Sequence, residues 1–349
     1  MTVEIMRDDP PRRAIIAALG AGRMGRGIAT AFAWAGHEVR LIDAKPRPQD
    51  DSTQLGVDAL AEIDASLAAM SAHGMFDDAL RPQVLRRVRF AARDAAAEAL
   101  ADADFVFEGV PETIDAKREA MAFLGDHLRG DAIVASTTST ILVDELAGLI
   151  THPGRFLNAH WLNPAYVVPL VELSAHEGTD PEAIAALRAL LESIGKVPVQ
   201  CRPAPGYIVP RLQSLIMNEA ARMIEQGVAS ATEIDRATRY GLGFRFANIG
   251  VVEFIDYGGN DILYHASRYL ARALGDERYA SPAIVDRHMR EGRNGLRDGQ
   301  GFYDFAQMDV ARYRSQTLAR MLDMLRHLDL ARPPVTDATQ PGFEPSDPS

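Results

Sequence analysis

Hydrophobic and polar positions at the start of the chain follow the order strand, glycine turn, helix. Residues 14–19 form a short apolar run that stops at the sequence GAGRMG, residues 20–25. An alanine-rich segment of helical pattern follows and ends at Gly36, since glycine is favoured just past the end of a helix. A second apolar run, residues 37–43, ends on an aspartate. The pattern predicts a complete βαβ unit.

Short apolar runs continue to alternate with helical stretches further along the chain. The predicted strands are residues 105–108, 132–135, 156–159 and 167–173. Strands that alternate with helices are typical of a mostly parallel sheet covered by helices on both faces. We therefore expect an α/β fold with a Rossmann-type doubly wound sheet.

The pattern changes at a segment rich in proline and glycine, PAPG at residues 203–206. Apolar residues then recur at three- and four-residue intervals from Leu212 to Ile224, which predicts a long amphipathic helix. Such a stripe is normally buried, here within the fold or against a partner subunit. The predicted domains are a tail at residues 1–12, a Rossmann domain at 13–202, an all-helical domain at 203–306, and a terminal helix with an unstructured end at 307–349.

Composition and charge restrict the classes of function. The chain has 349 residues, of which 47% are hydrophobic and 24% charged, as in ordinary globular proteins of about two domains. Its net charge of −11 argues against nucleic acid or an anionic membrane as partner. The single cysteine, Cys201, cannot form an internal disulfide. Because neither a signal peptide nor a membrane-spanning run is present, we expect a cytoplasmic protein.

The glycine turn has a chemical interpretation. Gly20 allows a tight turn, Gly22 lets backbone amides approach a pyrophosphate, and Gly25 lets the helix pack closely on the strand. Arg23 and Met24 then lie in the first turn of a helix whose amino terminus faces the phosphates. A glycine turn alone can also be purely structural, but its place between a strand and a helix favours dinucleotide binding.

The aspartate at the end of the second strand bears on the choice of dinucleotide. Asp43 lies about 20 residues after the glycine turn, where a carboxylate binds the adenosine ribose and repels a 2′-phosphate. The sequence therefore predicts NAD as cofactor. Lys45 and Arg47 lie nearby and keep NADP as an alternative.

Later segments carry a resemblance to a known family. They are STTST at residues 136–140, HWLNP at 160–164, Val171-Glu172, EFID at 253–256 and GQGFYD at 299–304. From about residue 13 to residue 305 the chain resembles the L-3-hydroxyacyl-CoA dehydrogenase family. The resemblance implies an NAD-dependent oxidoreductase that interconverts 3-hydroxyacyl-CoA and 3-ketoacyl-CoA, with a short-chain substrate such as 3-hydroxybutyryl-CoA. It also implies a homodimer that pairs through the helical domain.

The oxidation of a secondary alcohol needs a base for the hydroxyl proton. His160 suits this role because an imidazole exchanges protons near neutral pH, and Glu172 on the following strand can orient it. The resemblance implies that this pair is catalytic. Asn163 lies close to His160 in sequence and can help to hold either the substrate oxygen or the loop itself. The resemblance also places Ser139 near the reacting hydroxyl. Ser139 can instead simply cap the following helix, and we predict no metal site.

Two further residues match family positions on the nicotinamide side of the cofactor. They are Glu112, in the sequence VPE at residues 110–112, and Lys117. The alternative is that both are solvated helix charges.

The chain departs from the family in two places. Pro210 stands where the family has an asparagine that donates a hydrogen bond toward the substrate, and proline has no N–H. Residues 48–80 contain seven acidic residues and neither lysine nor arginine, where family members offer a lysine to coenzyme A. Arg81, Arg86 and Arg87 can compensate only if they fold back. A free hydroxy acid, as in the gulonate- and carnitine-oxidising branches of the family, is therefore an alternative substrate. Because a fold alone does not fix function, a non-catalytic NAD-binding or structural protein is an alternative of another class.

Overall fold

The computed structural model describes residues 13–334, and the chain divides into two compact units, Met1–Met217 and Asn218–Ser349. The predicted tail at residues 1–12 lies outside the described residues, and so do all but the first two residues of the unstructured end predicted from residue 333 onward. Among residues 13–334, no helix combines the length and the apolar character that crossing a bilayer requires.

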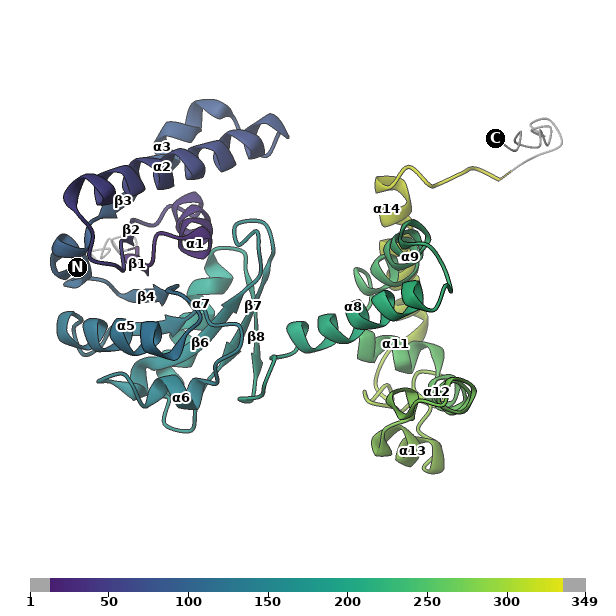
Figure 1. The fold of residues 1–349 in the computed structure, drawn as a ribbon. Helices are drawn as coiled ribbons and strands as arrows, with labels where there is room; N and C mark the ends of the chain where they lie inside the picture. Colours follow the sequence, from purple (N-terminus) through teal and green to yellow (C-terminus); the bar gives the residue numbers. More distant parts are fainter. Residues whose placement is uncertain (1–12, 335–349) are drawn as a thin grey trace, which may run out of the picture. The chain divides into compact units, whose positions relative to one another are not determined.

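The first unit is built on an eight-stranded sheet of order β3-β2-β1-β4-β5-β6-β7-β8 (Figure 1). The strands are β1 (Ile16–Leu19), β2 (Val39–Ile42), β3 (Val88–Ala91), β4 (Phe105–Glu108), β5 (Ile133–Ser136), β6 (Phe156–Trp161), β7 (Leu170–Ser174) and β8 (Val197–Cys201). Neighbouring strands are parallel except β6 and β7, which are antiparallel. The doubly wound α/β class predicted from the sequence is confirmed.

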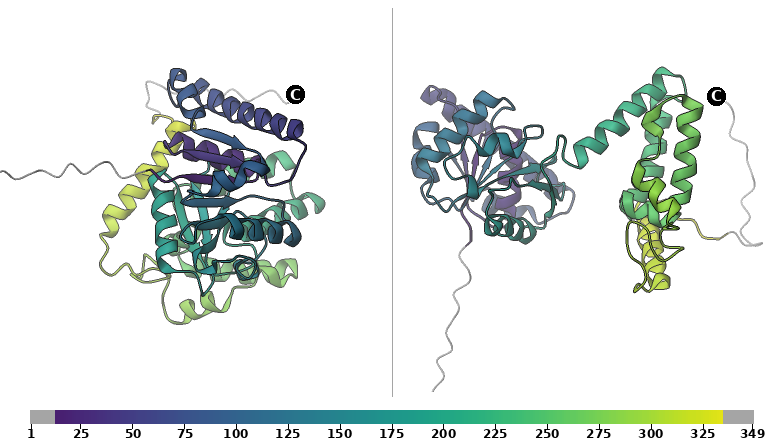
Figure 2. Two further views of the ribbon diagram at one scale, coloured as in Figure 1. Left: turned by 90° about the vertical axis from the view of Figure 1, so that its left-hand side faces the viewer. Right: turned by 90° about the horizontal axis from the view of Figure 1, so that it is seen from below.

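Helices cover both faces of this sheet because successive residues of a buried strand point to opposite sides. In β1, Ile16 and Ala18 join one apolar core, while Ala17 and Leu19 join the other. The first core packs under α1 (Arg23–Trp34), α2 (Gln49–Ala72), α3 (Arg81–Leu85) and α7 (Pro181–Ser193). The second packs under α4 (Ala96–Leu100), α5 (Ile114–His127) and α6 (Val143–Ala147). Figure 2 shows these helices on the two sides of the strands.

Two strands, β3 and β8, were not predicted from the sequence, and both lie at the edges of the sheet. β3 is four residues long, and Arg89 interrupts its apolar residues. β8 contains Pro198, which argues against a strand in a sequence but is tolerated at an edge, where one side of the backbone lacks a partner. An edge strand needs less continuous apolar sequence than a central one, so both signals were weak.

The acidic segment at residues 48–80 forms one long helix and a short turn. α2 starts with Asp50 and Asp51 in its first turn, where negative charge interacts favourably with the helix dipole. A 3-10 turn, η1 (Asp78–Leu80), leads into α3, and Arg81 at the start of α3 pairs with Asp64 at 2.7 Å and Asp78 at 2.9 Å. The guanidinium of Arg81 therefore forms ion pairs with the acidic residues of the neighbouring segment.

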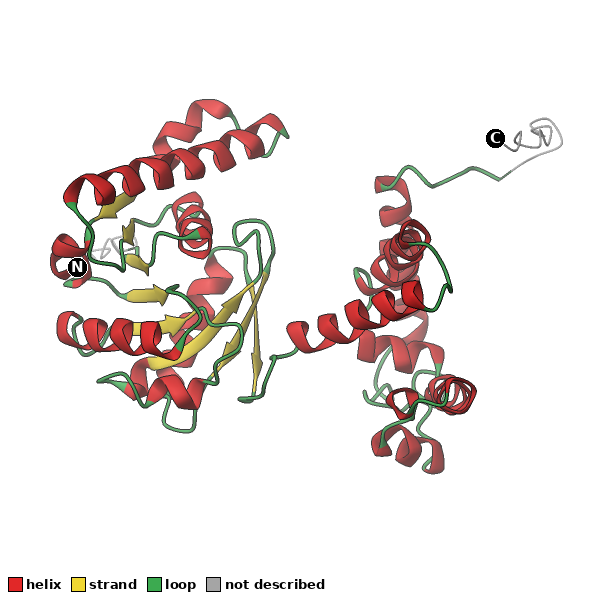
Figure 3. Cartoon of the chain, in the orientation of Figure 1, coloured by secondary structure: helices red, strands yellow, loops and turns green. Residues whose placement is uncertain are grey.

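The second unit consists of helices joined by loops, as Figure 3 shows for its described part. α8 (Val209–Glu225) leads into it, and its helices are α9 (Ala231–Ala237), α10 (Phe244–Phe246), α11 (Val251–Gly258), α12 (Asn260–Leu274), α13 (Ala283–Arg290) and α14 (Val310–His327), with a π-helical turn η4 (Thr238–Gly243). α14 lies in the region where the sequence predicted a terminal helix.

The segment GQGFYD closes this unit around one buried carboxylate. Asp256 of α11 is 1% exposed and accepts hydrogen bonds from the backbone N–H groups of Phe302 at 3.0 Å and Tyr303 at 2.8 Å. A Cβ at Gly301 would overlap the same carboxylate, so only glycine fits there. This motif therefore has a structural role in holding the end of the unit to α11.

Candidate functional site

The glycine turn between β1 and α1 forms an open crevice at the carboxyl ends of the strands. Gly20 has φ +112°, and a Cβ there would lie 2.7 Å from the carbonyl oxygen of Gly109. A Cβ at Gly25 would overlap the carbonyl oxygen of Gly20, whereas one at Gly22 would meet no atom within 4 Å. The turn is therefore tight at its ends and open at Gly22, as the approach of a pyrophosphate requires.

A cavity of about 370 Å³ extends from this turn to the end of β2. Asp43 lies in its wall, 2% exposed, and accepts hydrogen bonds from the backbone N–H of Lys45 at 3.1 Å and from Nε of Arg47 at 3.0 Å. The carboxylate is thus fixed where a ribose would lie, and the Arg47 guanidinium is held by it. These residues fit a dinucleotide, and Arg23 and Met24 lie in the first turn of α1, whose amino terminus could face the phosphates.

Lys117 lies inside the protein rather than on a solvated helix face. Its ammonium, with the side chain 1% exposed, pairs with both carboxylate oxygens of Glu108, at 2.9 and 3.0 Å. Ser136 Oγ donates to the same carboxylate at 2.6 Å, and Glu112 lies 3.6 Å from the ammonium. Lys117 is therefore not a solvated helix charge, and that alternative is wrong. Because its ammonium contacts Glu108 and Glu112, any influence of Lys117 on the cofactor would pass through these two carboxylates.

Glu112 organises the turn that follows β5. Its Oε1 accepts hydrogen bonds from the backbone N–H groups of Ser139 and Thr140, both at 2.9 Å, and from the hydroxyl groups of Thr138 and Thr140. Burial would raise the pKa of Glu112, but hydrogen bonds from this turn and the charge of Lys117 outweigh it and lower the pKa. Glu112 is therefore ionised and is not a free helix charge.

Ser139 lies exposed at the apex of that turn. It is not the cap of the next helix, since α6 has Leu142 at its N-cap position, and that alternative is wrong. The hydroxyl of Ser139 stays at the carboxyl edge of the sheet, and its predicted contact with the substrate remains a prediction.

His160 and Glu172 lie opposite each other in the antiparallel pair β6 and β7. Residues directly opposite in such a pair project from the same face, so the two side chains meet. Nδ1 of His160 lies 2.8 Å from Oε2 of Glu172, and the residues are 4% and 0% exposed. A carboxylate can only accept, so Nδ1 carries the proton and Nε2 keeps the lone pair that a general base needs.

The other oxygen of Glu172 binds the linker that follows β8. Oε1 accepts hydrogen bonds from the backbone N–H groups of Ile208 at 2.9 Å and Val209 at 2.8 Å. Burial would raise the pKa of Glu172, but the hydrogen bonds from His160 and from these two amides outweigh it and lower the pKa. Pro210 follows in the first turn of α8, where proline is tolerated.

Tyr207 is a residue of this site that the sequence analysis did not single out. Its ring stacks on the His160 imidazole with centroids 5.0 Å apart and planes 16° apart. The phenol is 7% exposed overall and bonds to Thr138 and Asn158. The only sequence signal was its position three residues before Pro210 in the segment GYIVPR, because stacking between distant segments leaves no periodicity.

Asn163 lies apart from the hydrogen-bonded group formed by His160 and Glu172. It is exposed just after β6 and lines a cavity of about 220 Å³ with residues of α1 and α2. In that cavity Arg26 of α1 forms an ion pair with Glu62 of α2. The predicted contact of Asn163 with the substrate oxygen stays a prediction.

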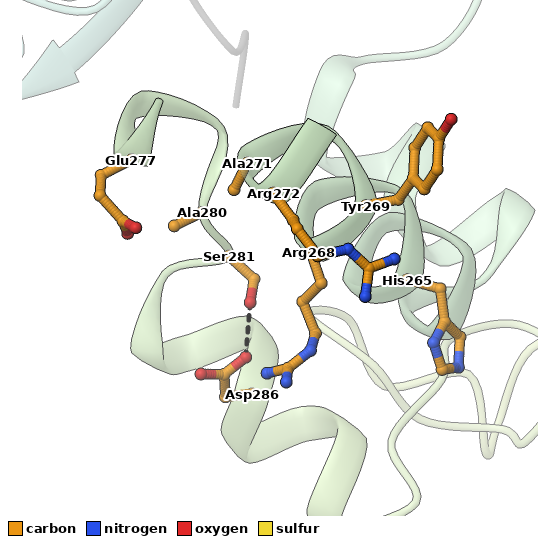
Figure 4. Close-up of a pocket in the computed structure, with 9 residues that line it drawn as sticks. All are labelled: His265, Arg268, Tyr269, Ala271, Arg272, Glu277, Ala280, Ser281 and Asp286. Carbon is orange, nitrogen blue, oxygen red and sulfur yellow. Dashed lines mark hydrogen bonds between the residues drawn. The ribbon is translucent and has the colours of Figure 1, made fainter. Parts of the chain in front are cut away.

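A further cavity of about 700 Å³ lies in the helical unit (Figure 4). Its walls carry charges of both signs, with Arg268 and Arg272 of α12 near Glu277 and Asp286, and Ser281 Oγ donates to Asp286 at 2.6 Å. The residues that line it include none of those predicted from the sequence. The mixed charge of its walls selects neither an anion nor a cation.

Comparison with known proteins identifies the family. Residues 15–204 match the model described as 3-hydroxyacyl-CoA dehydrogenase, NAD binding domain, and residues 206–305 match the model of the C-terminal domain. The chain belongs to the 3-hydroxyacyl-CoA dehydrogenase family. It is an NAD-dependent oxidoreductase that acts on CH–OH donors, and the predicted cofactor NAD is confirmed.

Relatives within the 3-hydroxyacyl-CoA dehydrogenase family differ in substrate. The chain is 28% identical to the 5-formyl-3-hydroxy-2-methylpyridine 4-carboxylate 5-dehydrogenase of Mesorhizobium japonicum, over 90% of this chain and 98% of that one. It is 32% identical to the L-carnitine dehydrogenase of Pseudomonas aeruginosa, over 89% and 93%. A crystal structure of a 3-hydroxyacyl-CoA dehydrogenase from Archaeoglobus fulgidus matches with a TM-score of 0.71 and 30% identity, over 91% and 100%.

Proposed function

We propose that this protein oxidises the 3-hydroxyl group of a short 3-hydroxyacyl substrate to a ketone, with His160 as general base and Glu172 as its orienting partner. The observation that carries the proposal is the 2.8 Å hydrogen bond between Nδ1 of His160 and Oε2 of Glu172. This bond leaves Nε2 as the proton acceptor and stabilises the imidazolium that forms. In the reverse reaction, protonated His160 returns this proton to the oxygen of the ketone as it is reduced.

The proposed step balances with NAD as hydride acceptor and His160 as proton acceptor. The O–H bond of the substrate breaks and its proton moves to Nε2 of His160, while the carbinol C–H bond breaks and the C=O bond forms. NAD, when bound, accepts the hydride. Because Pro210 offers no N–H, the hydrogen bond to the developing carbonyl comes in this proposal from Ser139.

Two substrate classes are candidates for this step. The first is a CoA thioester such as 3-hydroxybutyryl-CoA, which the family description and the Archaeoglobus fulgidus relative support. The second is a free hydroxy acid, which a specific observation favours: α2 carries acidic residues, and the nearby cation Arg81 is bound to Asp64 and Asp78. Arg87 in turn donates to the carbonyl oxygen of Ala33. The names of the carnitine and pyridine-carboxylate relatives also contain no coenzyme A.

A substrate panel tests the proposal and separates the two classes. We expect NADH formation with either short 3-hydroxyacyl-CoA thioesters or free 3-hydroxy acids, among them 3-hydroxybutyrate and L-carnitine. Replacing His160 by glutamine should lower kcat by about 10²–10⁴-fold, the usual contribution of a general base. The matched control is His73→Gln, since His73 is exposed at the end of α2. NAD binding without turnover of any panel member would contradict the proposal.

We also propose that the protein is a homodimer, as the sequence predicted. The apolar stripe of α8 supports this: no residue of α8 is buried, and Leu215 is 57% exposed. Exposed apolar stripes of this kind usually mark an interface. Sedimentation at micromolar concentration should show a dimer, which Leu215→Glu should dissociate and the control Gln213→Glu should not. A monomeric wild-type protein would contradict this proposal.

A further inference from the structure

Tyr207 adopts an unusual backbone conformation next to the proposed base. Its backbone angle φ is +44°, a value that residues other than glycine rarely adopt. Such a conformation persists only where the surroundings fix it, and such positions cluster at functional sites. Here the ring lies parallel to the His160 imidazole, with centroids 5.0 Å apart. The strained residue therefore delivers an aromatic face to the imidazole.

The phenol group of Tyr207 is fully engaged in hydrogen bonds. Its hydroxyl donates to the carbonyl oxygen of Thr138 at 3.0 Å and accepts from Nδ2 of Asn158 at 3.0 Å. Asn158 lies on β6, two residues before His160, and Thr138 precedes Ser139. Burial raises the pKa of Tyr207, so the hydroxyl remains a donor throughout the neutral range. One side chain thus links the base, its strand and the serine turn.

The next two residues of the chain complete the arrangement, because the N–H groups of Ile208 and Val209 bind Glu172. We infer that Tyr207 is a positioning residue for the proposed oxidation: its ring stabilises the imidazolium form of His160, and its hydroxyl fixes the turn that carries Ser139. This inference rests on the proposed function. It assigns the linker before α8 a part in catalysis through the residues it holds.

The physical basis is the attraction between a cation and the face of an aromatic ring within about 6 Å of its centroid. His160 is neutral before the proton transfer and positive after it, so a stacked ring favours the charged form. The other titratable groups that face Tyr207 are Glu172, Glu112 and Cys201, and Glu172 also bonds His160. The carboxylates remain in place when only the ring is changed, so the ring effect can be measured on its own.

Two substitutions separate the ring from the hydroxyl. Tyr207→Leu removes both, and we expect the apparent pKa of the base in the kcat/KM profile to fall by about one pH unit. Tyr207→Phe keeps the ring, so the pH profile should stay in place, while kcat/KM falls about tenfold because Thr138 and Asn158 lose a partner. A merely structural role would not separate these two readouts.

The outcomes distinguish this inference from the proposed function. If Tyr207→Leu folds and binds NAD but keeps the wild-type pH profile, the inference is wrong, although the proposed function stands. If His160→Gln retains turnover, the proposed function itself fails. Should the leucine variant not fold, phenylalanines with increasing ring fluorination at position 207 weaken the ring face at nearly constant shape. The pKa must then fall with fluorination relative to Tyr207→Phe, and an unchanged pKa overturns the inference.

Discussion

Replacing Glu172 by glutamine tests the proposed site most directly, since the two side chains have nearly the same shape. The carboxylate makes three hydrogen bonds, with His160 Nδ1 at 2.8 Å and with the N–H groups of Val209 at 2.8 Å and Ile208 at 2.9 Å. All three partners donate a proton. Glutamine has one accepting oxygen and one NH₂ group, so it cannot accept from both sides.

Either orientation of the glutamine disrupts the site. If its oxygen faces the two amides, its NH₂ faces Nδ1 of His160 and moves the ring proton to Nε2, where the base must accept. The corresponding tautomer error in Ser-His-Asp triads costs about 10⁴-fold, so we expect kcat to fall by about 10³–10⁴-fold. If the oxygen faces His160 instead, two buried N–H groups lose their acceptor, which costs about 1–3 kcal/mol of unfolding free energy for each unsatisfied group.

Stability against pH gives a second measurement on the same variant. The pKa of Glu172 is lowered in the folded protein, so its contribution to stability is complete above the unfolded value of 4.5 and is lost as pH falls through the folded pKa. The neutral glutamine of Glu172→Gln cannot titrate, so the variant should lose less stability than the wild type in this acid range. Thermal unfolding at several pH values measures the difference.

The assay is NADH formation with whichever substrate the panel identifies, followed together with thermal unfolding. Glu192→Gln is the matched control, since Glu192 lies on the surface of α7 and pairs with Arg188 only at 3.8 Å. If Glu172→Gln keeps kcat within about threefold of wild type while it remains folded, the tautomer argument is refuted.

Two further variants probe the cofactor crevice and its support. Asp43→Asn releases the guanidinium of Arg47 and removes the charge that repels a 2′-phosphate, so the ratio of kcat/KM for NADP to that for NAD should rise about tenfold or more; an unchanged ratio would exclude this role. Lys117→Met leaves the carboxylate of Glu108 buried without its cation, so unfolding free energy should fall by about 3–5 kcal/mol in urea titrations. Arg118→Met, at an exposed neighbouring position, is the control and should change little.

Much of the cofactor half of the fold was predictable because its signals are local. The glycines at positions 20, 22 and 25 lie within one turn, and Asp43 ends the next strand, so one short stretch of sequence contains the whole arrangement. The observed β4, Phe105–Glu108, has the same bounds as the predicted strand. Continuous apolar runs mark central strands because both faces of such strands are buried.

The His160–Glu172 contact followed from the family resemblance, but other contacts between distant segments were not predictable. Lys117 matched a family position, but only the packing of α5 against β4 gives it Glu108 as partner and removes it from solvent. No sequence pattern marked Tyr207, because its role depends on a ring stacked on a residue of β6 and on hydrogen bonds to residues far away in the sequence. A ring that closes over another segment leaves no trace in periodicity.

The sequence by itself determined the type of each chemical group: a dinucleotide turn, an imidazole, a carboxylate on a nearby strand and an acidic helix. The tertiary structure decided which groups meet. The antiparallel register of β6 and β7 sets His160 opposite Glu172, and the left-handed turn at Tyr207 brings the linker onto both. The reason is physical: residue type depends on local chemistry, whereas register and stacking depend on how all the strands and the linker bury their surfaces together.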